Sequence, residues 1–568
     1  MLPAVLAVTL LTGCAGVPQT SAPRIDGDVP ATGFTDVPDV RAYPAAPEPG
    51  ESPDQIVRNF LLACGSPDRQ HAVARLYLAK AAAVTWADGA GVVVLAQEPT
   101  VSVQRDGAEV VVRAEQQGEL DASGSYTPTA PMSLYTFPFM LVREKGEWRV
   151  ANPPAGVVIS SATFEQSYQR LNLYFLDQTE ARVVPDPRWF ATSREAEANV
   201  LVGALMGGPA PQLKPAVRNE LGDNLTQPRN VVPETDRVRV FLSGFGDLDG
   251  RAQVAAAAQI VWTLSQLGIP GIQIYDDNQV VTLPHRGSVQ QLGDWQTYNP
   301  DGLPLATHGY FIRAGAVWGT DGKALTGRVG QGYYAARSVA VCRDLSRIAV
   351  VGRLASGAAA LYVGSTHTGR LASRLTADTL TAPTWSPALD EVWTVQDGHS
   401  LVAVPWSGEP SRVSAPGLDR LGPVSALRLS RDGTRVAVVA GAAGMRRLYV
   451  GIVTRSPGSD AVESFQRVQP TLPDVLDAVW SAADQMVVLA RGGSTGNALW
   501  TVPVDGSTRE EMNQDGLLES PSEVAAAPNL PMLAEANGSM WSRSDRAGSW
   551  VGIVRTGSGH DQAPAYPG

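Results

Sequence analysis

Two ten-residue stretches of this chain read alike: VCRDLSRIAV at residues 341–350 and LSRDGTRVAV at residues 429–438. In each, a polar turn containing Arg-Asp joins two short apolar strands. Weaker copies of this motif occur elsewhere in the chain. The turns of the five copies lie at residues 342, 386, 430, 481 and 527. The separations are 44, 44, 51 and 46 residues. This spacing predicts a repeat architecture over the last half of the chain.

Repeats of about 40 to 50 residues that each contain several short strands are typical of β-propeller blades. Further strands at residues 360–364, 448–451 and 499–502 support this interpretation. Strands at residues 309–319 add one more copy. We therefore predict a β-propeller of five or six blades over residues 301–568, closed by a strand near the C-terminus. A β-sandwich with accidental spacing is the alternative.

The composition is that of a multidomain globular protein. The chain has 568 residues, of which 44% are hydrophobic and 18% are charged, which fits several folded domains rather than a disordered polymer. Lys plus Arg is 45 and Asp plus Glu is 56, giving a formal net charge of −11. That charge argues against a general affinity for nucleic acid.

Residues 51–158 form a first predicted α+β module. Ser52-Pro53-Asp54-Gln55 is a helix start with a capping box, and a second helix is expected over residues 68–86. Strands follow, including a pair around the Lys145-Gly146 turn. This order resembles the NTF2-like cone, whose enzymes use a pocket Asp and His. His71 has no carboxylate partner visible in the sequence, so we expect a surface or packing role for it, and Cys64 reads as a buried apolar residue.

Residues 159–300 form a second predicted α+β module. A strand, a helix, a second strand, a long helix and a hairpin are expected near residues 172–176, 192–209, 237–242, 251–267 and 272–281. The module resembles the GerMN domain through LYF at 173–175, AL at 204–205 with GP at 208–209, and QIVWTL at 259–264. That resemblance implies binding or assembly at the cell surface. Residues 247–250 hint at a calcium loop whose later ligands are missing, so a turn before a helix is expected.

The N-terminus resembles a bacterial lipoprotein signal. An apolar run at residues 2–11 leads into LTGC at residues 11–14, too short to span a bilayer. The resemblance implies cleavage of residues 1–13 and a Cys14 that carries N-palmitoyl and S-diacylglycerol groups. Seven prolines between residues 16 and 50 indicate a tether over residues 14–50. The expected location is the extracytoplasmic face of the cell membrane, although no basic residue precedes the apolar run; the alternative is a chance apolar start on a cytoplasmic protein.

We find no catalytic constellation in the sequence, and predict a protein that is not an enzyme and has no cofactor and no metal site. GGSTG at residues 492–496 matches a hydrolase elbow pattern but falls between two expected propeller strands, where a glycine-rich turn is expected instead. The six histidines show no metal-ligand spacing. Cys342 stands where two other repeats have Ser, so we interpret it as a blade-core position rather than a nucleophile.

The order of lipobox, tether, NTF2-like cone, GerMN and propeller resembles the LpqB family of Gram-positive envelope lipoproteins. The resemblance implies binding to the extracytoplasmic domain of a sensor histidine kinase like MtrB, and modulation of two-component signalling with effects on cell division and envelope homeostasis. Two alternatives stay open: a scaffold that binds the cell wall, and a hydrolase or lyase that acts on wall polymer at the propeller axis. Acidic or histidine side chains clustered at the axial mouth would favour the enzyme, whereas an apolar or mixed mouth would not.

Overall fold

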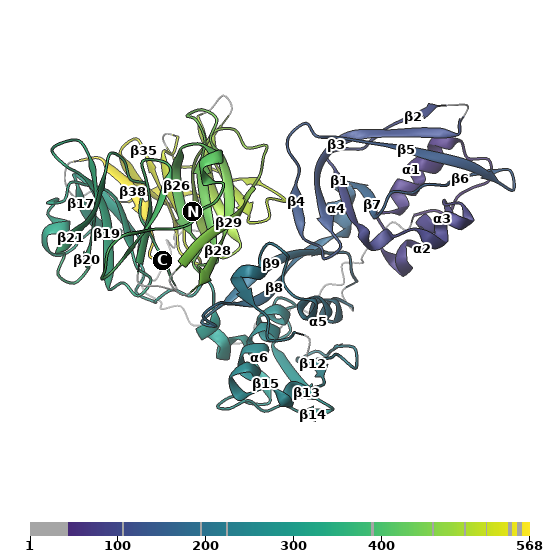
Figure 1. Ribbon diagram of the computed structural model, residues 1–568, viewed down its shortest axis with the longest axis horizontal. Coiled ribbons are helices and arrows are strands. Elements are labelled where there is room, and N and C mark those ends of the chain that lie inside the picture. The colour runs from purple at the N-terminus through teal and green to yellow at the C-terminus, as the bar shows by residue number, and fades with distance from the viewer. Residues whose placement is uncertain are drawn as a thin grey trace, which may run out of the picture. The chain divides into compact units, whose positions relative to one another are not determined.

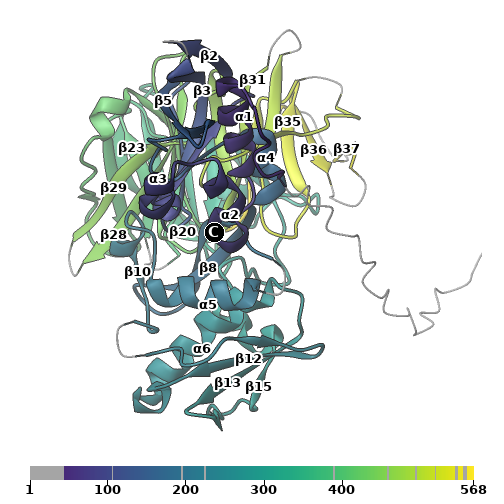
Figure 2. The same cartoon turned by 90° about the vertical axis from the view of Figure 1, so that its right-hand side faces the viewer.

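Two α+β modules precede a β-propeller in the computed structural model (Figures 1 and 2). The structure describes residues 44–568 except for 105–106, 194–195, 223–224, 388–390, 457–458, 493–495, 518–519, 544–547 and 554–558. Cys14, the predicted signal and most of the predicted tether lie outside the described residues. Within them, no helix is long and apolar enough to cross a membrane.

The first module packs helices against a seven-stranded sheet with the order β6-β5-β3-β1-β7, in which β2 and β4 also pair with β3. Its core contains the apolar face of the first helix, including Phe60. The capping box is present, since Ser52 N donates to Gln55 Oε1 at 2.9 Å. The elements are α1 (Pro53–Ala63), α2 (Asp68–Leu76), α3 (Lys80–Thr85), β1 (Gly91–Leu95), β2 (Thr100–Gln104), β3 (Glu109–Asp121), β4 (Tyr126–Pro128), β5 (Leu134–Glu144), β6 (Glu147–Val150), β7 (Val157–Ser160) and α4 (Ser161–Ser167).

The single helix expected over residues 68–86 was wrong, because α2 and α3 are separate. Leu78 forms a parallel bridge with Val150 at the end of β6. Val150 N donates to Tyr77 O at 2.9 Å and Ala79 N donates to Val150 O at 2.8 Å. These backbone groups bond to the sheet instead of continuing the helix ladder, so the helix is interrupted.

The second module has a three-stranded sheet, β10-β8-β9, and a five-stranded sheet in which β12 and β13 are parallel. Parallel neighbours need a crossover, which α6 supplies. Asp249 caps α6 by accepting from Arg251 N and Ala252 N at 2.9 and 2.8 Å, so residues 247–250 form the expected turn before a helix. The elements are β8 (Gln169–Asp177), β9 (Val183–Phe190), α5 (Glu197–Gly207), β10 (Val217–Arg218), β11 (Val232–Pro233), β12 (Arg237–Leu242), α6 (Gly250–Ser265), β13 (Gly271–Asp276), β14 (Gln279–Val280) and β15 (Val289–Gln290).

The propeller has six antiparallel sheets within the described residues, each one a blade. The inner strands contact one another in ring order, β38-β18-β22-β26-β30-β34 and back to β38. The first blade contains β16 (Tyr310–Arg313), β17 (Ala316–Gly319) and the C-terminal β38 (Asp561–Ala565), so the last strand closes the ring as predicted.

The other five blades each contain four consecutive strands, whose inner strand ends close to the repeated sequence turn. The helix α7 (Gly327–Gly330) lies between β17 and β18. The bounds are β18 (Ala336–Val341), β19 (Arg347–Arg353), β20 (Ala359–Ser365), β21 (Leu371–Ala377); β22 (Thr384–Trp385), β23 (Glu391–Gln396), β24 (Ser400–Pro405), β25 (Ser411–Arg412); β26 (Val424–Leu429), β27 (Arg435–Ala440), β28 (Arg447–Ser456), β29 (Ser459–Arg467); β30 (Val475–Ala482), β31 (Gln485–Arg491), β32 (Asn497–Pro503), β33 (Glu510–Glu511); and β34 (Glu523–Ala525), β35 (Met532–Ala536), β36 (Ser539–Arg543), β37 (Trp550–Gly552).

Candidate functional site

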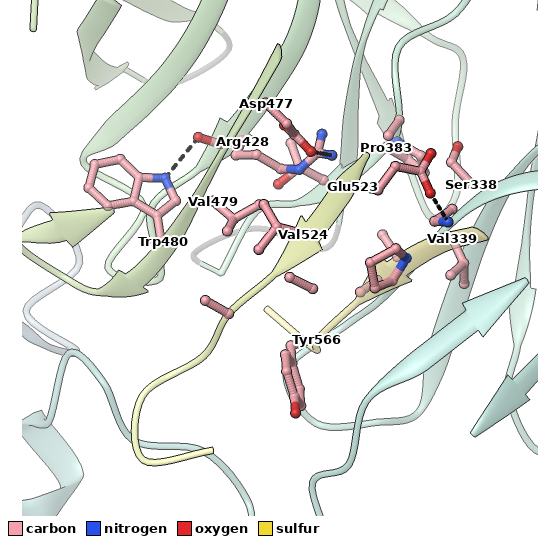
Figure 3. Close-up of a pocket in the computed structure, with 18 of the residues that line it drawn as sticks. Ser338, Val339, Pro383, Arg428, Asp477, Val479, Trp480, Glu523, Val524 and Tyr566 are labelled. Atoms are coloured by element: carbon pink, nitrogen blue, oxygen red, sulfur yellow. Dashed lines mark hydrogen bonds and ion pairs between the residues drawn. The ribbon is translucent and has the colours of Figure 1, made fainter. Parts of the chain in front are cut away.

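A pocket at the propeller axis is lined by residues of all six inner strands (Figure 3). Its volume is about 130 Å³, below the roughly 300–1,000 Å³ of sites that enclose a drug-sized ligand. Charged side chains gather in one part of the pocket, and Tyr566 stands apart from them (Figure 3). The ring of inner strands therefore encloses a small polar space.

The charged groups of this axial pocket are of both signs. Arg428 Nη2 lies 3.5 Å from Asp477 Oδ2, and Glu523 Oε2 accepts from the backbone N of Ala563. Burial raises the pKa of Asp477, which the Arg428 charge partly opposes. Burial also raises the pKa of Glu523, with a smaller upward contribution from Asp477. Arg337 also lines the pocket.

The two carboxylates of the axial pocket already have partners within the protein. The carboxylate of Asp477 faces an arginine, that of Glu523 accepts from the backbone, and none of the described residues that line the pocket is a histidine. The mouth is thus mixed in charge, which does not favour the wall hydrolase.

Arg431 is buried at the turn side of its inner strand and donates to Ala526 O at 3.1 Å and to Pro567 O.

His71 has a carboxylate partner that sequence reasoning missed. Its Nδ1 lies 3.0 Å from Asp88 Oδ2, and Asp88 Oδ1 accepts from Arg75 Nη2 at 2.8 Å. The ring is buried and lies 5.8 Å from that of Trp86. Asp88 is 17 residues away along the chain and reaches His71 only because the chain turns back after α3. The packing role expected for His71 matches this burial, while the expected lack of a partner is wrong.

The two cysteines that the structure describes differ in environment. Cys64 is 1% exposed, and burial raises the pKa of its thiol, as befits a buried apolar residue. Cys342 packs against a blade core but lies in the turn after β18. Its Sγ donates to Asp344 Oδ1 at 2.7 Å and accepts from Arg347 N at 3.1 Å. The blade-core interpretation of Cys342 is therefore incomplete, since the thiol also holds the turn.

Ser430 shows why that position alternates between Ser and Cys. Its Oγ donates to Asp432 Oδ1 at 2.6 Å and accepts from Arg435 N at 2.9 Å. The same two bonds are made two blades earlier by the thiol of Cys342. The repeated phrase thus encodes an inner strand, a side-chain-stabilised turn and a second strand.

The glycine-rich motif at residues 492–496 is only partly described by the structure. The segment 492–496 falls between the antiparallel strands β31 and β32. The serine of this motif, Ser494, lies outside the described residues. Among the described residues, no group of three or more His, Cys, Asp and Glu side chains is arranged to hold a metal ion.

Asp301 gives a pH prediction. Its Oδ1 accepts from Ala483 N at 2.7 Å, and burial, with Asp484 nearby, raises its pKa from 3.8 to about 6. Between these values the folded protein binds this proton more tightly than the unfolded chain, so stability falls as pH rises through the window. Asp301→Asn should remove that contribution and increase stability above pH 6.

Urea unfolding at pH 4, 5, 6 and 7 checks this prediction. The difference between the unfolding free energies of Asp301→Asn and the wild type should grow in favour of the variant as pH rises. Asn keeps an oxygen that can accept from Ala483 N, so the fold is retained. A difference that is constant across this pH range would contradict the assignment.

Comparison with known proteins identifies the family. The model described as "Lipoprotein LpqB, N-terminal domain" matches residues 46–165, "Sporulation and spore germination" matches residues 172–282, and "Lipoprotein LpqB beta-propeller domain" matches residues 315–567. The crystal structure of TolB from Acinetobacter baumannii is 15% identical, with a TM-score of 0.38, and covers 54% of this chain and 85% of its own.

Relatives match along nearly the whole length. Lipoprotein LpqB of Rhodococcus jostii (strain RHA1) is 31% identical over 566 residues, which cover 94% of this chain and 91% of the relative. Lipoprotein LpqB of Thermobifida fusca (strain YX) is 29% identical over 622 residues, which cover 98% and 97%. Because both LpqB models and these full-length relatives match, the chain belongs to the LpqB lipoprotein family.

Proposed function

We propose that this protein is a lipoprotein anchored through Cys14 at the extracytoplasmic face of the cell membrane, where it binds the extracytoplasmic domain of an MtrB-like sensor histidine kinase and modulates its signalling. The observation that carries the proposal is the match over nearly the whole chain to relatives named as lipoproteins. The LTGC sequence at residues 11–14 supplies the residue that the lipid would modify. The kinase follows from the family resemblance of the domain order.

Physical reasons favour binding over chemistry. A closed ring of six inner strands gives a rigid body, and rigid surfaces bind partners at low entropic cost. Confinement of the protein and a membrane receptor to one surface raises their effective concentration, so a modest affinity suffices. The axial pocket, with about 130 Å³ and mixed charges, is small for a polymer substrate.

Direct binding of purified proteins tests whether the sensor kinase is the partner. The purified full chain should bind the isolated extracytoplasmic domain of the kinase with a Kd in the micromolar range or tighter, measured by titration calorimetry. In intact cells, crosslinking should capture the same pair, and Cys14→Ala should reduce that crosslinking while leaving binding in solution unchanged, because only the effective concentration falls.

Three other outcomes would contradict the kinase as partner or support one of the alternative functions. Absence of binding at high micromolar concentration would refute the kinase as partner. Retention on purified peptidoglycan in cells that lack the kinase would instead support the wall scaffold. Release of soluble fragments from peptidoglycan would support the wall hydrolase.

A further inference from the structure

A pocket of about 410 Å³ lies between the first module and the propeller. Unlike the axial pocket, it falls within the roughly 300–1,000 Å³ of sites that enclose small organic ligands. The first module contributes mainly residues of β3, of β4 and of the segment after β4. The propeller contributes the loops between β29 and β30 and between β32 and β33. We call it the glutamine pocket, because Gln116, Gln117 and Gln469 line it.

The side chains of the glutamine pocket are polar but mostly uncharged. Besides the three amides, the lining residues that bear a hydroxyl are Tyr126, Thr129, Thr471, Ser507 and Thr508. The apolar part of the lining consists of alanines, prolines and a glycine, and no described lining residue is Leu, Ile, Val, Phe, Met or Trp. A largely apolar ligand would therefore find few side chains to pack against.

The charged side chains of this pocket are few and of both signs. Glu115 Oε1 accepts from Met132 N at 3.0 Å, and the guanidinium carbon of Arg509 lies 4.9 Å from the centre of the Trp500 ring. Glu165 is the other acidic lining residue. Because one positive charge stands against two negative ones, the lining does not match a strongly charged ligand.

Neutral groups of the lining keep capacity for hydrogen bonds. In the part of the chain that the structure describes, the side-chain amide of Gln116 and the hydroxyls of Thr129 and Thr508 have no partner within the protein. Gln117 Nε2 reaches Ser507 O only at the long distance of 3.5 Å. An amide offers both donors and an acceptor, and a hydroxyl can act in either role. The pocket therefore suits a ligand whose own groups both donate and accept.

The two propeller loops of the pocket are joined to each other through Gln469. This residue has a φ of 45°, in the left-handed region that residues other than glycine seldom adopt. Its Nε2 donates to Gly506 O at 2.8 Å, and its Oε1 accepts from Thr471 Oγ1 at 3.3 Å. These bonds fix the loops in place within the protein itself. A preformed site loses less entropy when it binds a ligand.

We propose that the glutamine pocket binds a neutral saccharide, with Gln116, Thr129 and Thr508 as hydrogen-bonding groups. Each hydroxyl of a sugar ring both donates and accepts, which matches the amide and hydroxyl groups of the lining. Pro128 and Pro131 supply ring carbons against which the C–H groups of a sugar can pack. Free oligosaccharides and the glycan of the cell wall share this chemistry.

Saturation-transfer difference NMR on the full chain tests the site, with two neutral disaccharides as probes: chitobiose, which is built from N-acetylglucosamine, and maltose. We expect saturable binding of at least one probe. Gln116→Ala and Thr508→Val should each weaken it about threefold or more, because each removes hydrogen bonds to the ligand. The double variant should weaken it about tenfold or more. Gln104→Ala is the matched control, since Gln104 is exposed on β2 and does not line the pocket.

Hydrogen exchange locates the bound saccharide and checks the fold. Saturating probe should protect peptides that cover residues 115–117 and 506–509 in the wild type and in Gln104→Ala, but not in the double variant. Gln116 is half-buried and Thr508 is exposed, so without ligand the variants should melt close to the wild type. Equal protection of all three proteins would show that the saccharide binds elsewhere, and would overturn the site.

Retention on purified peptidoglycan identifies the source of the saccharide. Retention that free chitobiose displaces would indicate wall glycan, whereas binding of a soluble probe without retention would indicate a free saccharide. Failure of both probes and of peptidoglycan to bind, or binding that survives the double variant unchanged, would overturn the proposal. None of these measurements includes the kinase domain, so their outcome is separate from that of kinase binding.

Discussion

Asp561→Asn should lower the free energy of unfolding of the propeller by about 3–5 kcal/mol, the usual cost of breaking a buried ion pair from one side. Asp561 Oδ1 and Oδ2 accept from Arg313 Nε and Nη2 at 2.5 and 2.9 Å, and the two side chains are 0% and 4% exposed. Arg313 also lies 5.1 Å from the ring of Phe311 and 5.2 Å from that of Trp318. Without Asp561, the buried guanidinium of Arg313 would lose the two bonds that this carboxylate accepts.

The position of this pair makes the loss specific to ring closure. Arg313 and Asp561 are register partners of β16 and β38, the strands that join the first blade to the C-terminal end of the propeller. Urea unfolding measures the loss, and hydrogen exchange should accelerate first in peptides that cover β16 and β38. The same substitution at Asp236, whose pair with Arg237 is exposed, should cost much less, because solvent screens that pair. Equal losses at both positions would contradict the prediction.

A double variant shows whether the stability is lost through the unpaired charge of Arg313 or through the missing hydrogen bonds of the pair. Arg313→Leu combined with Asp561→Leu should recover much of the stability that Asp561→Asn loses, because apolar residues often replace a buried pair without cost. If the double variant is as unstable as the single one, the hydrogen bonds of the pair, rather than the unpaired charge, determine ring closure.

Cys14→Ala should abolish lipid labelling and release the protein from the membrane. Alanine has no sulfur to form a thioether, and an anchor of several acyl chains is what makes attachment stable, at about 0.8 kcal/mol per buried CH₂. Metabolic labelling with palmitate and fractionation of membranes measure the two effects. All label and nearly all membrane retention should disappear together.

Cys342→Ser is the matched control for this experiment. The serine at the equivalent position in a later blade, Ser430, makes the same two turn bonds as the Cys342 thiol, so the fold should survive. Its label should equal that of the wild type. Label that persists in Cys14→Ala would show that another residue carries the lipid.

Local patterns predicted much of the architecture because they act over a few residues. The capping box at Ser52 and the turn before the helix at residues 247–250 formed as expected. The turn at Lys145-Gly146 joined β5 to β6, with both residues at positive φ. The repeat spacing revealed the blades, since each repeat is one unit with the same strand and turn signals. The interruption at residues 77–79 was missed, because its cause is a bridge to Val150 in a distant strand.

The candidate sites were less predictable, because their members are far apart in the sequence. The axial pocket takes one segment from each inner strand, over residues 337–568, and the sequence shows only that these strands recur. Asp88 and His71 are likewise 17 residues apart and come into contact only in the folded chain.

The sequence by itself determined the repeat and the two α+β modules, because strand period, capping and turn chemistry depend on neighbouring residues, and the assignment of Cys14 as the lipidated residue stays a prediction. Only the tertiary structure decided the number of blades and the pair that closes the ring. Arg313 and Asp561 are 248 residues apart. Burial and electrostatic balance depend on such distant neighbours, which come together only when the ring closes.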